Sequence, residues 1–184
     1  MFLIILFLAG CTSVSITNYA DVNGRILGSE NATVKIYEFT DYACLFCKKA
    51  ENVVYDIVKK YGNNVKLEHK NFIVHSEAYI AAEAVECSGD QNKFWEYNKL
   101  LFDNQNDFSI ATLNGYANDL KLNMTEFGLC MIEHKKKIVI EKDIKDAQLY
   151  GVKGTPTFVV NDKVLPGLVS IDDISEIIEG ELKK

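Results

Sequence analysis

Residues 37–50, YEFTDYACLFCKKA, decide the fold, because they join a strand to a helix through two cysteines. Residues 33–39 are rich in β-branched and aromatic side chains, which is typical of a central strand. Apolar side chains then recur at helical spacing over residues 44–60, and residues 65–74 alternate as a second strand. The order strand, helix, strand predicts a βαβ unit whose two strands are parallel.

A block of helices is predicted to separate this unit from the remaining strands. Ser109 and Thr125 are the expected N-caps within it. Strand signals return over residues 155–167, TPTFVVNDKVLPG, and a last helix is expected over residues 171–183. The helical tracts, recognised by apolar positions on one face, cover residues 78–87, 94–102, 110–120 and 126–150.

This order of elements predicts an α/β fold with a helical block inserted between two halves of a small sheet. The first half of the sheet domain is expected over residues 25–75, and the second half over residues 149–184. The helical insertion is expected over residues 76–148.

The amino terminus predicts export. Residues 2–9 are continuously apolar, but they are shorter than the roughly 20 residues of a spanning helix, which suits a secretory signal. The sequence LAGC, which ends at Cys11, resembles the lipobox of bacterial lipoproteins. We therefore expect residues 1–11 to be a signal peptide ending in a lipidated Cys11, and residues 12–24 to be a tether. An ordinary cleaved signal is the alternative, and it exports the protein as well.

Composition limits the possible functions. A chain of 184 residues that is 48% hydrophobic is long enough for one globular domain. The net charge is only -6, and the longest basic run is Lys135 to Lys137. Such a chain lacks the basic surface that tracks phosphates, so nucleic-acid binding is not expected.

Cys44 and Cys47 form the pattern that carries chemistry. A cysteine at a helix amino terminus has its thiolate stabilised by the helix dipole, and a second cysteine one turn later lies within reach of a disulfide. The spacing thus favours reversible thiol exchange. A zinc half-site and two inert core cysteines are the alternatives, but the chain has no second pair of this spacing to complete a zinc site.

Three separated motifs resemble the thioredoxin-fold thiol:disulfide oxidoreductases of the DsbA-like type. They are YEFTDYACLFC, AAEAVECSGDQNKFWEYNKLLFDNQ and GVKGTPTFVVND, and the resemblance covers about residues 25–182. It implies a thioredoxin fold, with a helical domain between the βαβ and ββα halves. It also implies an enzyme, needing neither cofactor nor metal, that forms or exchanges disulfide bonds in extracytoplasmic proteins.

The resemblance assigns roles to residues on both sides of the insertion. Cys44 is implied to be the nucleophile and Cys47 the buried partner that resolves the mixed disulfide. Pro156, preceded by Thr155, is implied to be a cis-proline whose loop faces the pair and binds substrate backbone. An ordinary proline at the start of a strand is the alternative for Pro156.

Two glutamates match acids of the family. Glu38, six residues before Cys44, is implied to be a buried acid that moves a proton to or from Cys47. A solvent-facing strand glutamate is its alternative. Glu51 matches a second acid more weakly and is otherwise a surface charge.

The residues between the cysteines leave the direction of electron flow open. Family members usually carry proline after the first cysteine, whereas this chain has Leu45 and Phe46, which offer the thiolate no polar group. A disulfide reductase or isomerase is therefore an alternative, with slight support from Thr155. A peptide-binding surface lipoprotein without catalysis is another.

The remaining cysteines, Cys87 and Cys130, lie in the predicted insertion. An exported protein favours a structural disulfide between them over two buried thiols. The expected partners are exported proteins with cysteines and a membrane partner that reoxidises or reduces the chain, besides the membrane that holds the lipid anchor. We expect a monomer in the periplasm or at the cell surface.

Overall fold

The computed structural model describes residues 24–184. The predicted signal peptide, its Cys11 and the predicted tether up to residue 23 lie outside the described residues. The elements, in chain order, are β1 (Ile26–Gly28), β2 (Val34–Thr40), α1 (Leu45–Tyr61), the 3₁₀ turn η2 (Gly62–Asn64), β3 (Val65–Asn71), α2 (Ala78–Gly89), α3 (Phe94–Asp103), α4 (Ile110–Asp119), α5 (Met124–Ile132), α6 (Lys137–Leu149), β4 (Thr157–Val160), β5 (Lys163–Pro166) and α7 (Ile171–Leu182).

The strands form one five-stranded sheet in the order β1-β3-β2-β4-β5. β2 and β3 are parallel, with Val34 opposite Val65, whereas each of the other neighbouring pairs is antiparallel. The predicted βαβ unit and the α/β fold class are therefore confirmed, and β2 is the central strand.

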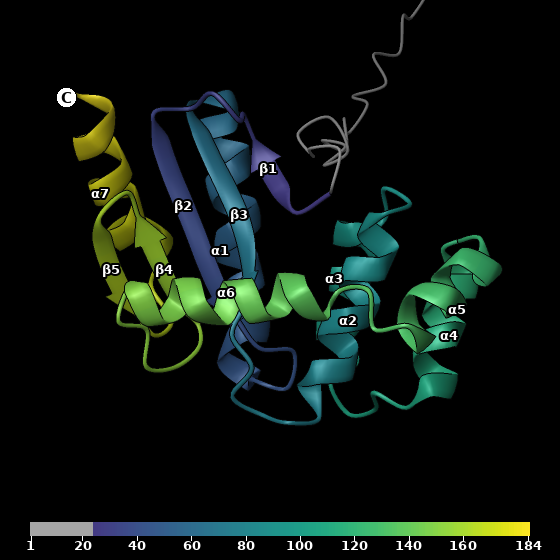
Figure 1. Cartoon of the computed structure of the whole chain (residues 1–184). Coiled ribbons are helices and arrows are strands. Elements are labelled where there is room, and N and C mark those ends of the chain that lie inside the picture. Colours follow the sequence, from purple (N-terminus) through teal and green to yellow (C-terminus); the bar gives the residue numbers. More distant parts are fainter. Residues whose placement is uncertain (1–23) are drawn as a thin grey trace, which may run out of the picture.

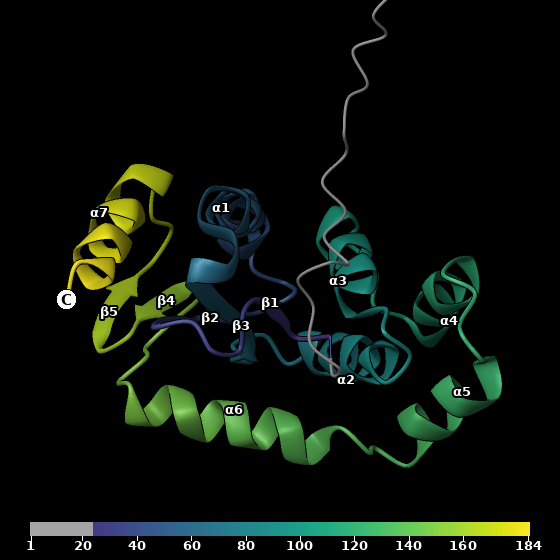
Figure 2. The same cartoon turned by 90° about the horizontal axis from the view of Figure 1, so that it is seen from above.

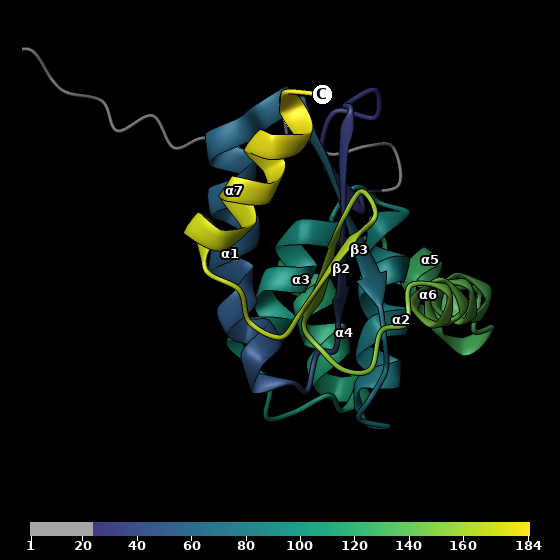
Figure 3. The same ribbon diagram turned by 90° about the vertical axis from the view of Figure 1, so that its left-hand side faces the viewer.

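Helices cover both faces of the sheet. Figures 1 and 2 show α1 and α7 on one face and α6 on the other, while α2 to α5 gather beside the sheet. The same layers are seen from the side in Figure 3. Along β2, Val34 and Ile36 belong to the core shared with α1 and α7, and Phe39 packs with Ala147 of α6. Because side chains of a strand alternate between faces, one strand supplies both cores.

The tract predicted as helical over residues 126–150 is divided into two helices. His134, with φ 50°, follows α5, and the amides of His134 and Lys135 donate to the carbonyls of Met131 and Cys130. These two bonds close a Schellman motif, which ends α5. α6 then runs across the sheet and contacts β3. The division of the chain at residues 76 and 148 stays a prediction.

Two further expectations are corrected. Asn123, not Thr125, caps α5, because the Asn123 side chain accepts hydrogen bonds from the amides of Thr125 and Glu126. β3 ends at Asn71, three residues earlier than predicted. Its neighbour β2 stops at Thr40, so the chain beyond residue 72 has no strand to pair with.

A disulfide and an apolar seam hold the insertion together. Cys87 of α2 and Cys130 of α5 form the disulfide, with their Cα atoms 5.9 Å apart. Phe94 and Trp95 at the start of α3 are buried in the same core. None of the helices over residues 24–184 is long and apolar enough to cross a membrane.

Candidate active site

Cys44 is the N-cap of α1 and lies at the edge of the core. Its backbone is extended, with φ -81° and ψ 119°, and its carbonyl accepts hydrogen bonds from the amides of Cys47 and Lys48. Cys44 is 8% exposed and Cys47 is fully buried, and both carry free thiols. Leu45 and Phe46 between them are 70% and 58% exposed. The two cysteines are therefore flanked by apolar side chains that project into solvent.

The loop before β4 faces this cysteine pair. The peptide bond between Thr155 and Pro156 is cis. The Cys44 thiol donates to the Thr155 carbonyl, with 3.4 Å between Sγ and the oxygen. The loop is fixed from both sides, because the Thr157 hydroxyl donates to the Gly154 carbonyl and the Gly167 amide donates to the Pro156 carbonyl. Cys44 and the loop, more than 100 residues apart in sequence, thus meet at one point.

Cys47 is more deeply buried than Cys44. Burial raises the pKa of the Cys47 thiol well above its ordinary value, and the hydroxyls of Thr40 and Thr155 oppose that shift only in part. A thiol with such a pKa stays protonated at neutral pH. Any reaction that releases Cys47 as a leaving group must therefore also deliver a proton to it.

Glu38 on β2 is a buried carboxyl on the face of the sheet that α1 covers. Burial raises its pKa well above the ordinary range, and the charge of Glu51 raises it further. Neither of its oxygens has a hydrogen-bond partner among the described residues. Burial thus favours the protonated form of Glu38, and the solvent-facing alternative does not apply, because the side chain is buried.

Glu51, two turns into α1, is buried as well. Burial raises its pKa to about 7, although a hydrogen bond of 2.8 Å from Asn98 Nδ2 to Glu51 Oε2 acts in the opposite direction. It also lines a cleft of about 640 Å³ that adjoins the cysteine pair. The cleft is lined by Leu45, Phe46, Lys48, Lys49, Glu51, Asn52, Tyr55, Lys99, Phe102 and Asp103.

Asp41 was not identified from the sequence. Its Oδ1 accepts from the Ala43 amide at 2.7 Å, and its Oδ2 accepts from the amides of Val74 and His75 at 2.7 and 2.8 Å. The side chain therefore ties the segment before Cys44 to the loop after β3. An aspartate just before a predicted helix is a turn signal, so the hydrogen bond from Ala43 to Asp41 could have been predicted from the sequence.

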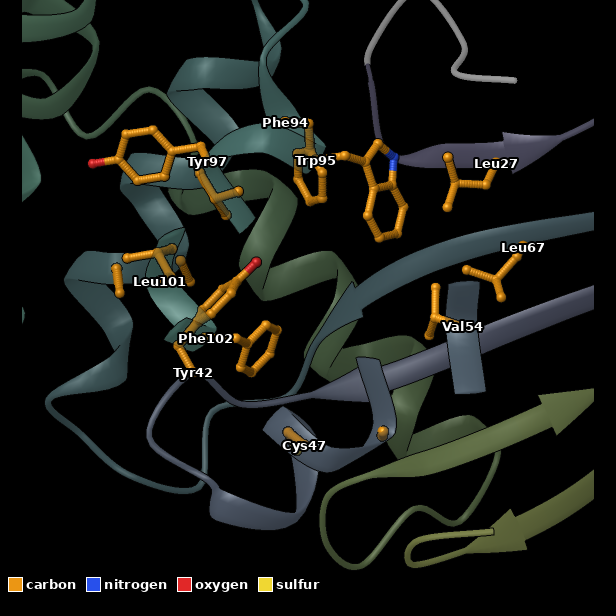
Figure 4. Close-up of a cluster of buried hydrophobic side chains, with 14 of the residues drawn as sticks. Leu27, Tyr42, Cys47, Val54, Leu67, Phe94, Trp95, Tyr97, Leu101 and Phe102 are labelled. Atoms are coloured by element: carbon orange, nitrogen blue, oxygen red, sulfur yellow. The ribbon is translucent and has the colours of Figure 1, made fainter. Parts of the chain in front are cut away.

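Gln105 was missed too, and it joins the helical insertion to the segment from Tyr42 to Cys44. Its Nε2 donates to the carbonyl of Tyr42 at 2.8 Å and to that of Cys44 at 2.9 Å. Tyr42 itself packs against Phe102 of α3, with ring centroids 4.8 Å apart. Figure 4 shows both rings in the same buried cluster as Cys47. The insertion thus forms one wall of the site.

No metal site accompanies the pair in the described part of the chain, where no group of three or more His, Cys, Asp or Glu side chains could hold an ion.

Comparison with known proteins agrees with this geometry. The family described as thioredoxin matches residues 20–180. The chain therefore belongs to the thioredoxin family. Disulfide bond formation protein D of Bacillus subtilis is 29% identical over 183 residues, which cover 92% of this chain and 82% of that protein. The crystal structure of BdbD from Bacillus subtilis superposes with a TM-score of 0.78 at 29% identity, over 90% of this chain and 97% of the other.

These relatives confirm the DsbA-like type that the motifs predicted within the family. Another relative is a Na⁺/H⁺ antiporter, NhaA 1 of Salinispora arenicola, which is 33% identical over 157 residues. That match covers 84% of this chain but only 24% of the antiporter. The chain thus spans about a quarter of the length of the antiporter relatives it matches.

Proposed function

We propose that this chain is a thiol:disulfide oxidoreductase that forms or exchanges disulfide bonds in extracytoplasmic proteins through Cys44 and Cys47. One observation carries the proposal. Cys44 lies at the N-terminus of α1 with its Sγ 3.4 Å from the Thr155 carbonyl, while Cys47 is buried one turn behind it. A nucleophile at the edge of the core, a fully buried resolving thiol and a loop beside the nucleophile suit thiol exchange.

The reaction begins with the pair oxidised. A substrate thiolate attacks Cys44 Sγ, the bond between Cys44 and Cys47 breaks, and its electron pair leaves on Cys47. A second substrate thiolate then attacks the substrate sulfur of the mixed disulfide and releases Cys44. Two electrons have passed to the enzyme, which ends as a dithiol, and the substrate ends as a disulfide.

Glu38 supports this step as the proton donor. Burial raises the pKa of the Glu38 carboxyl and so favours its neutral form. Burial also raises the pKa of the Cys47 thiol, so a Cys47 thiolate readily accepts a proton. Proton transfer from the Glu38 carboxyl to Cys47 discharges the leaving group without a charge being left in the core. The loop at Thr155 and Pro156 would hold the substrate backbone against Cys44 during the exchange, as the resemblance implies.

Electron flow can also run from the enzyme to the substrate, which makes a reductase or isomerase the second candidate. The exposed Leu45 and Phe46 between the cysteines favour it, because apolar side chains give the Cys44 thiolate no hydrogen bond. The reduction potential, measured against glutathione, separates the two. An oxidant gives a value well above that of thioredoxin, about -270 mV, and a reductase gives a value near it.

Export and membrane attachment belong to the same proposal. The apolar run before Cys11 and the resemblance to a lipobox support an extracytoplasmic protein held by a lipid on Cys11. A membrane protein would then reoxidise or reduce the pair, and the chain would act as a monomer. Mass spectrometry of the intact chain isolated from membranes tests the anchor, because a diacylated Cys11 adds the mass of two acyl chains. Unmodified Cys11 in that fraction contradicts it.

Trapping is the experiment that tests catalysis. In a Cys47→Ala variant, Cys44 can form a mixed disulfide but no resolving thiol can release it. We expect covalent complexes with exported proteins that disappear on reduction, and none in a Cys44→Ala control. A chain that only binds peptides, with a structural pair, yields no such complexes in either variant.

A further inference from the structure

Glu38 and Glu51 are two carboxyls buried beneath one helix, but their surroundings differ. The oxygens of Glu38 have no hydrogen-bond partner among residues 24–184, whereas Glu51 Oε2 accepts a hydrogen bond from Asn98 Nδ2. The charge of Glu51 raises the pKa of Glu38, so ionisation of one opposes ionisation of the other. Burial therefore favours a proton on this pair of carboxyls, and the mechanism depends on which of the two carries it.

Asn98 is the end of a buried chain of hydrogen bonds. The Tyr42 hydroxyl donates to Asn98 Oδ1 at 2.8 Å, and Tyr42 Oη lies 3.3 Å from His69 Nε2. His69 Nε2 in turn lies 3.3 Å from Asn71 Oδ1. All four side chains are buried, so their partners come from the protein. The chain connects α3 to β3 through the residue two before Cys44.

Two acidic side chains at the Asn71 end of this chain determine which groups donate and which accept its hydrogen bonds. Asn71 Nδ2 donates to Glu86 Oε1 at 2.8 Å and to Asp143 Oδ2 at 3.1 Å, which leaves Asn71 Oδ1 to face His69. Burial, and to a lesser degree the charge of Arg25, lowers the pKa of His69 to about 3, so its ring is neutral and has a single N–H. An acceptor opposite Nε2 requires that N–H to be on Nε2.

The remaining bonds then follow one direction. The single Nε2–H of His69 lies 3.3 Å from both Asn71 Oδ1 and Tyr42 Oη and is shared by these two acceptors. The Tyr42 hydroxyl then donates to Asn98 Oδ1, and the Asn98 amide group donates to Glu51. If Tyr42 instead donated to His69 Nε2, this nitrogen would carry no hydrogen, and its lone pair would face a lone pair of Asn71 Oδ1. The N–H at His69 Nδ1 would also be buried without a partner, since Nδ1 has none among the described residues.

We propose that this directed chain keeps Glu51 as the carboxylate and leaves the proton of the acid pair on Glu38, with Asn98 as the positioning residue. An N–H donor stabilises a carboxylate and offers nothing to the hydrogen of a carboxylic acid. Glu38 therefore holds its proton before the exchange begins. When the substrate thiolate breaks the Cys44–Cys47 bond, that proton passes to Cys47 Sγ, and water later returns a proton to Glu38. The inference rests on the proposed exchange reaction.

The charged residues near Glu51 do not determine whether it is ionised, because their effects on its pKa are opposite in sign. On α3, the charge of Lys99 lowers the pKa of Glu51 and the charge of Asp103 raises it, and these two residues pair with each other at 2.6 Å. The Tyr55 hydroxyl, one turn further along α1, is also hydrogen-bonded to Glu51 and lowers its pKa, to a lesser degree than Asn98 does. Glu38 on β2 completes the surroundings. Lys48 and Lys49 line the same cleft as Glu51. The cleft gives Glu51 contact with solvent, which Glu38 lacks.

Infrared difference spectroscopy of the full-length oxidised protein locates the proton. At about pH 8, where ordinary carboxyls are ionised, we expect the carbonyl band of one protonated carboxyl. Glu51→Gln keeps this band, because Glu38 remains buried and unpartnered. Glu38→Gln abolishes the band, because Glu51 is ionised; a band that persists in Glu38→Gln would show that Glu51 carries the proton and would overturn the proposal.

A pair of variants tests the role of the chain itself. Asn98→Leu removes the donor to Glu51, and we expect the titration midpoint of Glu51 to rise by about one to two pH units. Tyr42→Phe, which frees the Asn98 amide to rotate, shifts the midpoint in the same direction by less. Tyr97→Phe is the matched control, because the Tyr97 hydroxyl donates to the Leu113 carbonyl outside the chain, and it leaves the midpoint unchanged. An unshifted midpoint in Asn98→Leu overturns the positioning role.

These results are independent of the proposed function. Trapping with Cys47→Ala reports whether the chain exchanges disulfides, whereas the infrared band reports only where the proton resides. A protein that traps no partner but shows the expected band refutes the exchange reaction and leaves the proton assignment standing.

Discussion

The described residues contain two cysteine pairs, which differ in their spacing and in their surroundings. Cys44 and Cys47 are three residues apart at a helix start, beside the exposed apolar side chains of Leu45 and Phe46. Cys87 and Cys130 are separated by 43 residues, join two packed helices, and are 1% and 4% exposed. The difference teaches that reversibility depends on the surroundings, because two nearly buried sulfurs between packed helices leave an attacking thiolate little access to the bond.

The sharpest separation of the two pairs comes from removing one cysteine of each kind. Cys44→Ala is expected to abolish disulfide exchange with a model dithiol peptide, since no other free thiol of the described chain approaches the surface. Cys87→Ala combined with Cys130→Ala is the matched control and retains exchange at the same protein concentration. Exchange that survives in Cys44→Ala would move the active pair elsewhere.

Removing the Cys87–Cys130 disulfide is expected to act on stability. Closure of a loop of 43 residues lowers the entropy of the unfolded chain. By the chain-entropy relation, Cys87→Ala with Cys130→Ala should lose about 3–4 kcal/mol of unfolding free energy. Urea denaturation of the oxidised protein and of the variant measures the difference. An unchanged midpoint would mean that the insertion is held by packing alone.

Glu38→Gln is expected to slow the release of Cys47 without changing access to Cys44. A positioned general acid contributes about 10²-fold or more, so single-turnover reduction of the oxidised pair should slow by roughly that factor. The raised pKa gives the sign of a second effect. A carboxyl whose pKa is higher in the folded state destabilises the fold as pH rises above its unfolded value.

Glu38→Gln should therefore raise the unfolding free energy at neutral pH and leave it unchanged at pH values below the ordinary carboxyl range. Denaturation at the two pH values measures this. Equal destabilisation at both would show that Glu38 serves only packing.

Gln105→Ala gives the smallest expected effect. Two hydrogen bonds to backbone carbonyls are lost from the wall of the active pair, at about 0.5–1.5 kcal/mol each. We expect a modest loss of stability and a decrease of a few fold in exchange rate, because the position of Cys44 becomes less defined. Gln91→Ala, which removes a comparable amide contact to Asn123 far from the pair, controls for the loss of stability and keeps the rate.

Local patterns were enough to predict the parallel unit, the helix that opens at Cys44, and the position of Glu38 on the central strand. Hydrophobic period and turn chemistry act over a few residues, and a sequence displays them directly. The end of β3 was predicted wrongly because it depends on where the neighbouring strand β2 ends. The pattern of residues 65–74 contains no information about that position.

The polar half of the site could not be predicted. Asn98 reaches Glu51 across 47 positions, and Gln105 reaches Tyr42 across 63. Each sits on or just after an amphipathic helix, where an amide is equally suited to the wet face. Only the packing of α3 against α1 and the active-site loop turns these amides inward.

Redox titration with a count of disulfides tests the central claim most directly. The intact protein is equilibrated over a series of glutathione ratios, quenched, alkylated and weighed by mass spectrometry. The account predicts that alkylation of Cys44 and Cys47 changes with the ratio, while Cys87 and Cys130 stay unmodified throughout. Two pairs that titrate together, or a Cys44–Cys47 pair that never changes, would contradict it.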